Sequence, residues 1–301
     1  MDANILEIYY MADESSKKFD RVMEGHRLAE ENSKPHRNRK FIMPGSEVTA
    51  IVTMFRLKHF RHLKAFYTQY IQVHCREGFP QTASHNRFVE LQQKVVVKLS
   101  LFLQLCCLGK CSGISFIDSA PLRACHMKRE HNHKVFKGLA AKGKSSTGWF
   151  SGFKLHLVIN DKGGIFDFLI TQANVDGRGP LKNKRFHGKL SGKIFAGRGY
   201  VPQDLSGKLF VDGIHLITRL KKNMKNSPMP VRDKICLRKR SLIETVNDGL
   251  KNICQVEHTR HRSFENFIGN MVAALVAYNF LPKKPSLNLD IIDMNGLQRI
   301  A

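Results

Sequence analysis

The sequence is poor in acidic residues and in long apolar runs. Its 301 residues hold 25 Asp and Glu against 49 Lys and Arg, a formal net charge of +24 with a pI near 10.0. Such an excess calls for a polyanionic partner, so nucleic acid is the leading expectation, although ribosomal RNA or a membrane surface would satisfy the same charge. No segment reaches the roughly 20 apolar residues of a transmembrane helix. The first ten residues lack the basic start of a signal peptide, so we expect a cytoplasmic protein with no membrane partner.

Paired cysteine motifs are also missing. The seven Cys are odd in number and scattered, and no CxxC pair occurs, which argues against a disulfide framework or a zinc ribbon. Cys125, His126, His131 and His133 lie close together, but their spacing fits no zinc pattern. A basic loop that contains histidines explains them better.

Residues 1–110 have a helical pattern and are expected to form an all-helical, DNA-binding domain. Ser46 and Ser84 are expected N-caps. Two helices joined by a Gly-Pro turn near Pro80, the second with Arg87 in its first turn, can form a helix-turn-helix that reads bases. A plain helical bundle with a basic face explains the pattern slightly better. The basic linker 34–40 adds three candidate DNA contacts: Arg37, Arg39 and Lys40.

The character of the chain changes at residue 111. An apolar run at 112–119 predicts a strand that ends at Asp118, and the alternating stretches around Gly163-Gly164 predict an antiparallel hairpin over 152–175. Two more strands and three helices are expected along the rest of the segment: strands at 193–197 and 213–220, and helices at 203–210, 240–253 and 263–281. This order predicts an α/β layer with a mixed sheet over 111–283, followed by a C-terminal tail at 284–301.

Asp118 and Glu244 are candidate metal ligands. Taken alone, Asp118 is better explained as a residue that caps the next turn. Glu244 alone is better explained as the partner of Arg240 in a surface i,i+4 ion pair, worth about 0.3–0.5 kcal/mol. Together they fit two of three places in a two-metal site, because Mg²⁺ prefers carboxylate oxygens and two ions can stabilise both oxygens of a phosphodiester displacement. The acid in the second place should end the strand at 194–197, where the chain has Gly197.

The segment 126–148 is expected to be a basic loop that contacts DNA. It interleaves cations with Phe136 and precedes Trp149, a composition that suits a phosphate backbone and an unpaired base, although a solvated loop has the same composition. Its candidate contacts are Lys128, Arg129, Lys134, Lys137, Lys142 and Lys144, to which Arg240 is added.

Several motifs in order resemble the bacterial insertion-sequence transposases of insertion-sequence family 982, over essentially the whole chain. They read FIDSAPLRACHMKRE, KVFKGLAAKGKSSTGWFSGFKLHLVIND, LITQANVDGRGPL, GRGYVPQDL, LITRLKKNMKN, RKRSLIETVNDGLKN and QVEHTRHRSFENF. The resemblance implies an Asp-Asp-Glu active site on an RNase H-like mixed sheet flanked by helices. It makes Asp118 the first catalytic Asp and Glu244 the catalytic Glu, with Mg²⁺ or Mn²⁺ bound in a two-metal site.

The second acid of that family stands where this chain has Gly197, followed by Arg198. Asp176 and Asp204 are the acids that can substitute, but they are expected on a loop and on the next helix. We therefore expect a degenerate copy of a transposase that binds terminal inverted repeats and target DNA as a homo-oligomer, with impaired strand cleavage and transfer. Two alternatives stay open: a catalytically inactive relative that represses transposition, and a general nucleic-acid-binding protein.

Overall fold

The computed structural model describes residues 3–24, 43–145, 148–200, 203–219, 228–257 and 261–287. The linker 34–40 with Arg37, Arg39 and Lys40, and the tail from residue 288, lie outside these residues. The chain divides into two compact units. Met1–Cys107 and Leu250–Leu281 form the helical unit, and Leu108–Gly249 and Pro282–Ala301 form the sheet unit. No helix in the described ranges is long and apolar enough to cross a membrane.

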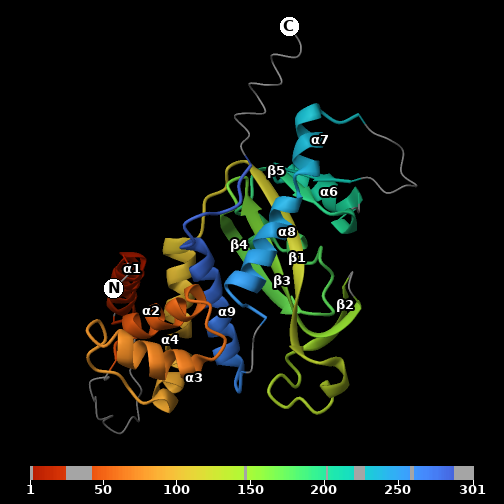
Figure 1. Cartoon of the computed structure of the whole chain (residues 1–301). Coiled ribbons are helices and arrows are strands. Elements are labelled where there is room, and N and C mark those ends of the chain that lie inside the picture. Colours follow the sequence, from red (N-terminus) through yellow and green to blue (C-terminus); the bar gives the residue numbers. More distant parts are fainter. Residues whose placement is uncertain are drawn as a thin grey trace. The chain divides into compact units, whose positions relative to one another are not determined.

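The helical unit is built around α2, α4 and α9, whose apolar faces meet in one core (Figure 1). Its elements are α1 (Ala3–Glu24), α2 (Gly45–Leu57), α3 (Leu63–Ala65), the π-helix η1 (Phe66–His74), α4 (His85–Phe102), the π-helices η2 (Leu103–Cys107) and η6 (Gly249–Ile253), and α9 (Phe264–Asn279). Most residues of α2 and α9 are buried, which is typical of helices at the centre of a bundle.

Of the two N-caps expected from the sequence, one is confirmed. Ser84 accepts a hydrogen bond from the backbone N–H of Arg87 and caps α4, as predicted. Ser263 caps α9 in the same way, accepting from the N–H of Asn266. The N-cap expected at Ser46 is wrong, because α2 begins at Gly45 with Pro44 at its N-cap and Ser46 is buried inside the helix.

The segment before the Gly-Pro turn is not one continuous helix. α2 ends at Leu57, and His59 has a φ of 58°, which a helix cannot continue through. A second helical element, α3 with η1, precedes the turn, and residues 75–84 connect it to α4. Arg87 lies in the first turn of α4, as the sequence predicts, and its guanidinium pairs with Glu90.

The last long helix packs with the N-terminal helices. α9 contacts α2 and α4, and the hydrogen bond from Gln93 Nε2 to Ser263 Oγ measures 3.0 Å. The observed units therefore differ from the expected division at residue 110, which assigned 263–281 to the α/β segment. The apolar pattern of α9 shows that it is buried but does not show which core buries it.

The sheet unit holds a six-stranded mixed sheet of order β2-β3-β1-β5-β6, in which β4 also pairs with β3. Its strands are β1 (Ile114–Cys125), β2 (Ala141–Ser145), β3 (Gly148–Asn160), β4 (Ile165–Gln172), β5 (Gly192–Ala196) and β6 (Ile214–Thr218). Its helices are η3 (Met127–Arg129), η4 (Pro180–Lys182), α5 (Lys184–His187), η5 (Arg198–Tyr200), α6 (Gln203–Val211), α7 (Val231–Arg238) and α8 (Ser241–Asp248). The hairpin predicted over 152–175 is confirmed as the antiparallel pair β3–β4.

Two sequence expectations about the sheet are wrong. Asp118 does not end its strand, because β1 continues to Cys125 and pairs with β3 on the far side of Asp118. The basic segment 126–148 is not all loop, because Ala141–Ser145 forms β2 beside β3. Gly143 permits this strand, since a Cβ there would lie 2.1 Å from the carbonyl oxygen of Ala173. Both additions depend on pairing with β3, which a local pattern does not reveal.

Candidate active site

Two parallel strands bring Asp118 beside Gly197. β1 and β5 pair in register from Ile114 with Lys193 to Ile117 with Ala196. Asp118 and Gly197 are therefore the next residues on neighbouring strands. β5 is buried at Ile194, Phe195 and Ala196 and ends there, so residue 197 lies at the carboxyl edge of the strand, where open α/β sheets place their ligands.

Helix α8 brings a second carboxylate and a cation to the same edge. α8 packs against β1, and its N-cap residue is Arg240. Nη2 of Arg240 donates to Oε1 of Glu244 at 2.6 Å, and Nη1 lies 3.9 Å from Oδ1 of Asp118. The side chains of Asp118, Arg240 and Glu244 are 29%, 20% and 57% exposed. One guanidinium thus pairs with the two acids that the sequence singled out.

The backbone at Gly197 leaves room for a side chain. A Cβ at this position would meet only Arg240, at 3.7 Å from Nη1 and 3.8 Å from Cζ, which are ordinary van der Waals contacts. Gly197 is not among the glycines with positive φ, so an L-residue fits its conformation. A side chain introduced at position 197 would point to the guanidinium of Arg240, which pairs with both Asp118 and Glu244.

The electrostatics of Asp118 result from burial opposed by Arg240. Burial raises the pKa of Asp118, and the repulsion of Glu244 adds to this. The positive charge of Arg240 and the backbone N–H of Ser119 lower it, but by less. The pKa of Tyr200 is also raised, first by burial and then by the charge of Asp118. Asp118 therefore stands in a setting where its negative charge is costly and Arg240 offsets only part of the cost.

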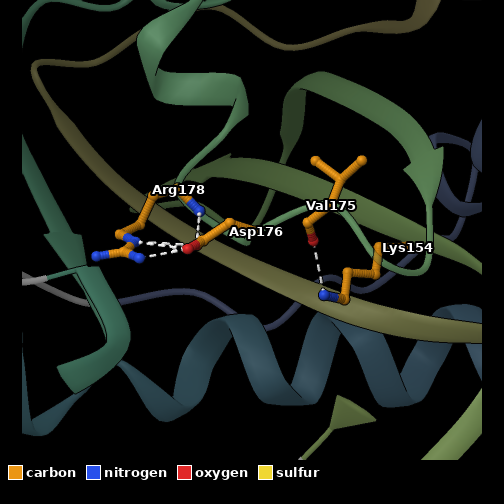
Figure 2. Close-up of polar contacts among 4 residues, drawn as sticks. All are labelled: Lys154, Val175, Asp176 and Arg178. Atoms are coloured by element: carbon orange, nitrogen blue, oxygen red, sulfur yellow. Dashed lines mark hydrogen bonds and ion pairs between the residues drawn. The ribbon is translucent and has the colours of Figure 1, made fainter. Parts of the chain in front are cut away.

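Asp176, one of the two possible substitutes for the missing acid, is already engaged. Nε of Arg178 donates to Oδ1 at 2.9 Å and to Oδ2 at 3.0 Å, Nη2 pairs with Oδ2, and the backbone N–H of Arg178 donates to Oδ1 at 2.9 Å (Figure 2). This pairing lowers the pKa of Asp176 to about 2. Nearby, Nζ of Lys154 donates to the carbonyl of Val175 at 2.7 Å. The side chain of Asp204 lies outside the described residues.

The residues present do not fit a two-metal site. Two Mg²⁺ ions need several carboxylate oxygens that are free to ligate them. Here Asp118 and Glu244 pair with a cation, and position 197 supplies no ligand atom. Within the described residues, no group of three or more His, Cys, Asp or Glu side chains is arranged to hold a metal ion.

The predicted DNA contacts of the segment 126–148 share one property, which is that their side chains are exposed: Lys128, Arg129, Lys134, Lys137, Lys142 and Lys144. Lys142 and Lys144 project from β2 on either side of the buried Gly143. Their Nζ atoms lie 5.4 Å and 5.9 Å from the ring centroid of Trp149, which is 58% exposed. Arg240 differs from these cations, because its guanidinium pairs with Glu244 and Asp118.

Sequence reasoning missed two features of this edge. It treated Arg240 as a DNA contact and as the i,i+4 partner of Glu244, and it gave no indication of the Asp118 contact. It also gave no role to Tyr200, which is buried and whose pKa responds to Asp118, Arg240 and Asp176. The sequence signal for Arg240 was its spacing from Glu244, and the contact with Asp118 required the packing of α8 on β1.

The mixed sheet thus carries one carboxylate, Asp118, on its strand β1, and the helix α8 packed against that strand carries a second, Glu244. The family model described as the transposase DDE domain matches residues 108–264, which is just over half of the chain. The chain belongs to the transposase DDE domain family, and such a domain implies an RNase H-like fold. No curated protein matches the chain.

Proposed function

We propose that the protein is the transposase of a bacterial insertion sequence of the family 982 type, in a degenerate copy whose strand cleavage and transfer are impaired. The family membership and the mixed α/β sheet support the transposase assignment. The observation that carries the impairment is the position of Arg240, which pairs with Asp118 and Glu244 beside Gly197.

In this proposal Asp118 and Glu244 are the remaining first and third acids of an Asp-Asp-Glu site. Loss of groups that merely support a metal ligand commonly costs about 10–100-fold in metal affinity or activity, and loss of a ligand itself costs more. Gly197 has no ligand atom, so Mg²⁺ or Mn²⁺ would have to displace Arg240 and bind with only two carboxylates. We expect the fold and DNA binding to persist while strand cleavage and transfer are impaired.

DNA is the proposed partner, both as terminal inverted repeats and as target. The net charge of +24 and the exposed cations of residues 126–148 support it. Lys142 and Lys144 beside Trp149 can hold a phosphate backbone next to a stacked base. Arg87 and the linker cations Arg37, Arg39 and Lys40 belong to the same proposal. We further propose a homo-oligomer that acts in the cytoplasm at the nucleoid.

A second candidate function is repression of transposition by an inactive copy that occupies the ends of the element. The same observation favours it, because a guanidinium that neutralises both remaining acids removes the metal site without removing the basic surface. Binding without cleavage is the property that separates this candidate from an impaired enzyme.

The test compares cleavage of element-end DNA by the wild-type protein and by Gly197→Asp, in Mg²⁺ and in Mn²⁺. Gly199→Asp is the matched control, since it adds the same carboxylate two residues further on, where a Cβ meets nothing within 4 Å. Cleavage that rises in Gly197→Asp and not in Gly199→Asp supports the proposal. Equal activity of the wild type and Gly197→Asp refutes the role of position 197. Specific binding of element ends with no cleavage by the wild type favours the repressor, and equal competition by random DNA contradicts both candidates.

A further inference from the structure

The helical unit contains a large cavity between the end of α2, the start of α4 and the start of α9. Its volume is about 1110 Å³, and all of its lining residues belong to this unit. The cavity is far larger than a phosphate ion and has the size of a site for a small organic ligand. The first turns of α4 and α9 line it, and the N-terminus of a helix favours negative charge.

The floor of the cavity contains a buried guanidinium. Arg56 is 2% exposed, and Nη1 and Nη2 donate to the carbonyl of Gln255 at 2.9 Å and to Oδ1 of Asn270 at 3.0 Å. Both partners are neutral, and the Nε–H of Arg56 has no partner. Among the described residues no carboxylate forms an ion pair with Arg56. A buried cation without a counter-charge is costly, so an anion in this cavity would relieve that cost.

Three more side chains of the lining carry a buried polar atom without a partner in the structure. Gln92 and Asn266 are 4% and 6% exposed, and Nε2 of Gln92 and Oδ1 of Asn266 make no hydrogen bond. Nε2 of His261 also makes none. Buried polar groups are almost always paired, so unpaired atoms gathered at one cavity point to a ligand that pairs them. That ligand must supply acceptors for Gln92 and Arg56 and a donor for Asn266.

The mouth of the cavity is cationic. Arg61, Lys64 and Arg262 line it and are exposed. Glu257 is the single carboxylate of the lining, and its Oε1 already pairs with Nζ of Lys251 at 3.0 Å. The ligand therefore carries negative charge at the mouth and both donors and acceptors at the floor.

We propose that this cavity is a nucleotide-binding pocket, in which the cations at the mouth hold a phosphate and the buried amides of Gln92 and Asn266 hold the edge of a base. A nucleoside phosphate combines the two chemistries that the lining requires. Its source is either a free nucleotide or a single nucleotide of a DNA strand. The pocket does not include the proposed catalytic residues, since none of Asp118, Gly197, Arg240 or Glu244 lines it.

The test is isothermal titration calorimetry of the full-length protein with dAMP and dTMP, with the uncharged nucleosides, and with inorganic phosphate. We expect dAMP or dTMP to bind saturably and more tightly than the uncharged nucleoside or inorganic phosphate. Gln92→Leu should weaken it about tenfold, because the variant removes a hydrogen-bond donor from the floor. Arg61→Ala should weaken it by a similar factor. Arg76→Ala, an exposed arginine of the same unit that does not line the pocket, should leave it unchanged.

Several other outcomes overturn the proposal. If inorganic phosphate binds as tightly as the monophosphate, the pocket is only an anion site. If a nucleoside binds as tightly as the monophosphate, the cations at the mouth do not hold a phosphate. Equal losses in Arg61→Ala and Arg76→Ala indicate non-specific attraction. Arg61 is exposed, so its variant tests the pocket even where Gln92→Leu fails to fold. A short single-stranded oligonucleotide distinguishes the two sources of the nucleotide. If the oligonucleotide binds in a way that depends on Arg61 and Gln92 and the monophosphates do not bind, the ligand is a nucleotide of a DNA strand. If the monophosphates bind in this way and the oligonucleotide does not, the ligand is a free nucleotide. Absence of binding by both refutes the pocket.

Discussion

Arg240 lies 3.9 Å from Asp118, although the two residues come from a helix and a strand that are far apart in the sequence. The contact offsets only part of the cost of burying Asp118, whose pKa is raised. A carboxyl with a raised folded-state pKa contributes stability that is present below its unfolded pKa of about 3.8 and is lost as the pH rises through the folded value. At neutral pH the ionised Asp118 is therefore a net cost.

Asp118→Asn should accordingly stabilise the protein at pH 7, because it removes the charge and keeps the shape. Each kcal/mol of relief would raise the Tm by about 2–4 °C for a chain of this size. Thermal unfolding in EDTA at pH 7 and at pH 3.5 measures it, and the gain should shrink at the lower pH, where the wild-type carboxyl also becomes protonated. Glu244→Gln is the control, since that side chain is more exposed. A variant less stable than the wild type at pH 7 would contradict this balance of burial and charge.

A second prediction concerns His156, which is fully buried between β1 and β4. Its Nε2 lies 2.8 Å from Oγ1 of Thr171, and burial lowers the pKa of His156 to about 4. A lowered histidine pKa means that the neutral form is favoured in the fold, so stability is present above the unfolded value of about 6.5 and is lost as the pH falls towards 4. The difference between the two pKa values corresponds to roughly 3 kcal/mol.

Urea unfolding at pH 7.5 and 4.5 tests this prediction. His156→Gln should lose less stability than the wild type between the two pH values, whatever its stability at pH 7.5. His215→Gln is a suitable control, because His215 is an exposed residue of β6. Identical pH dependence in wild type and His156→Gln would show that folding does not lower the pKa of this imidazole.

The third prediction concerns the basic strand β2. Lys142→Gln with Lys144→Gln should reduce the slope of log K against log salt for DNA by about one unit for each phosphate that the variant no longer neutralises. Fluorescence anisotropy between 50 and 200 mM salt measures the slope. Lys17→Gln removes a lysine of α1 that already pairs with Asp13 at 2.7 Å, so it should change the slope little. Equal changes in the two proteins would mean that β2 does not touch DNA.

The sequence predicts those elements whose signals are local. The hairpin β3–β4 follows from alternating residues on both sides of Gly163-Gly164, and the cap Ser84 follows from a hydroxyl before an apolar helix. Long-range contacts were not predictable in this way. β2 forms because β3 offers a free edge, and α9 joins the helical unit because α2 and α4 bury its apolar face.

The same distinction between local signals and long-range contacts applies to the candidate site. Asp118, Gly197 and Glu244 were selected from strand ends, helix spacing and a family resemblance, and the register of β1 with β5 places the first two side by side. The place of Arg240 between the acids needed the tertiary structure. So did the floor of the cavity in the helical unit, where Arg56, Gln92 and Asn266 come from three helices and show no common motif.

The last prediction tests whether Arg240 and a metal ion compete for the same carboxylates. Gly197→Asp should raise the affinity for Mn²⁺ at least tenfold by adding a third carboxylate, and Arg240→Gln should raise it by releasing Asp118 and Glu244. Calorimetry on the wild type, both single variants and the double variant gives a double-mutant cycle. We expect the double variant to bind most tightly, with a coupling between the two changes, since an Asp at 197 would itself contact the guanidinium. Gly199→Asp is again the control and should bind like the wild type. Equal affinity in all four proteins would mean that these acids hold no metal, and the proposal of an impaired active site would fail with that result.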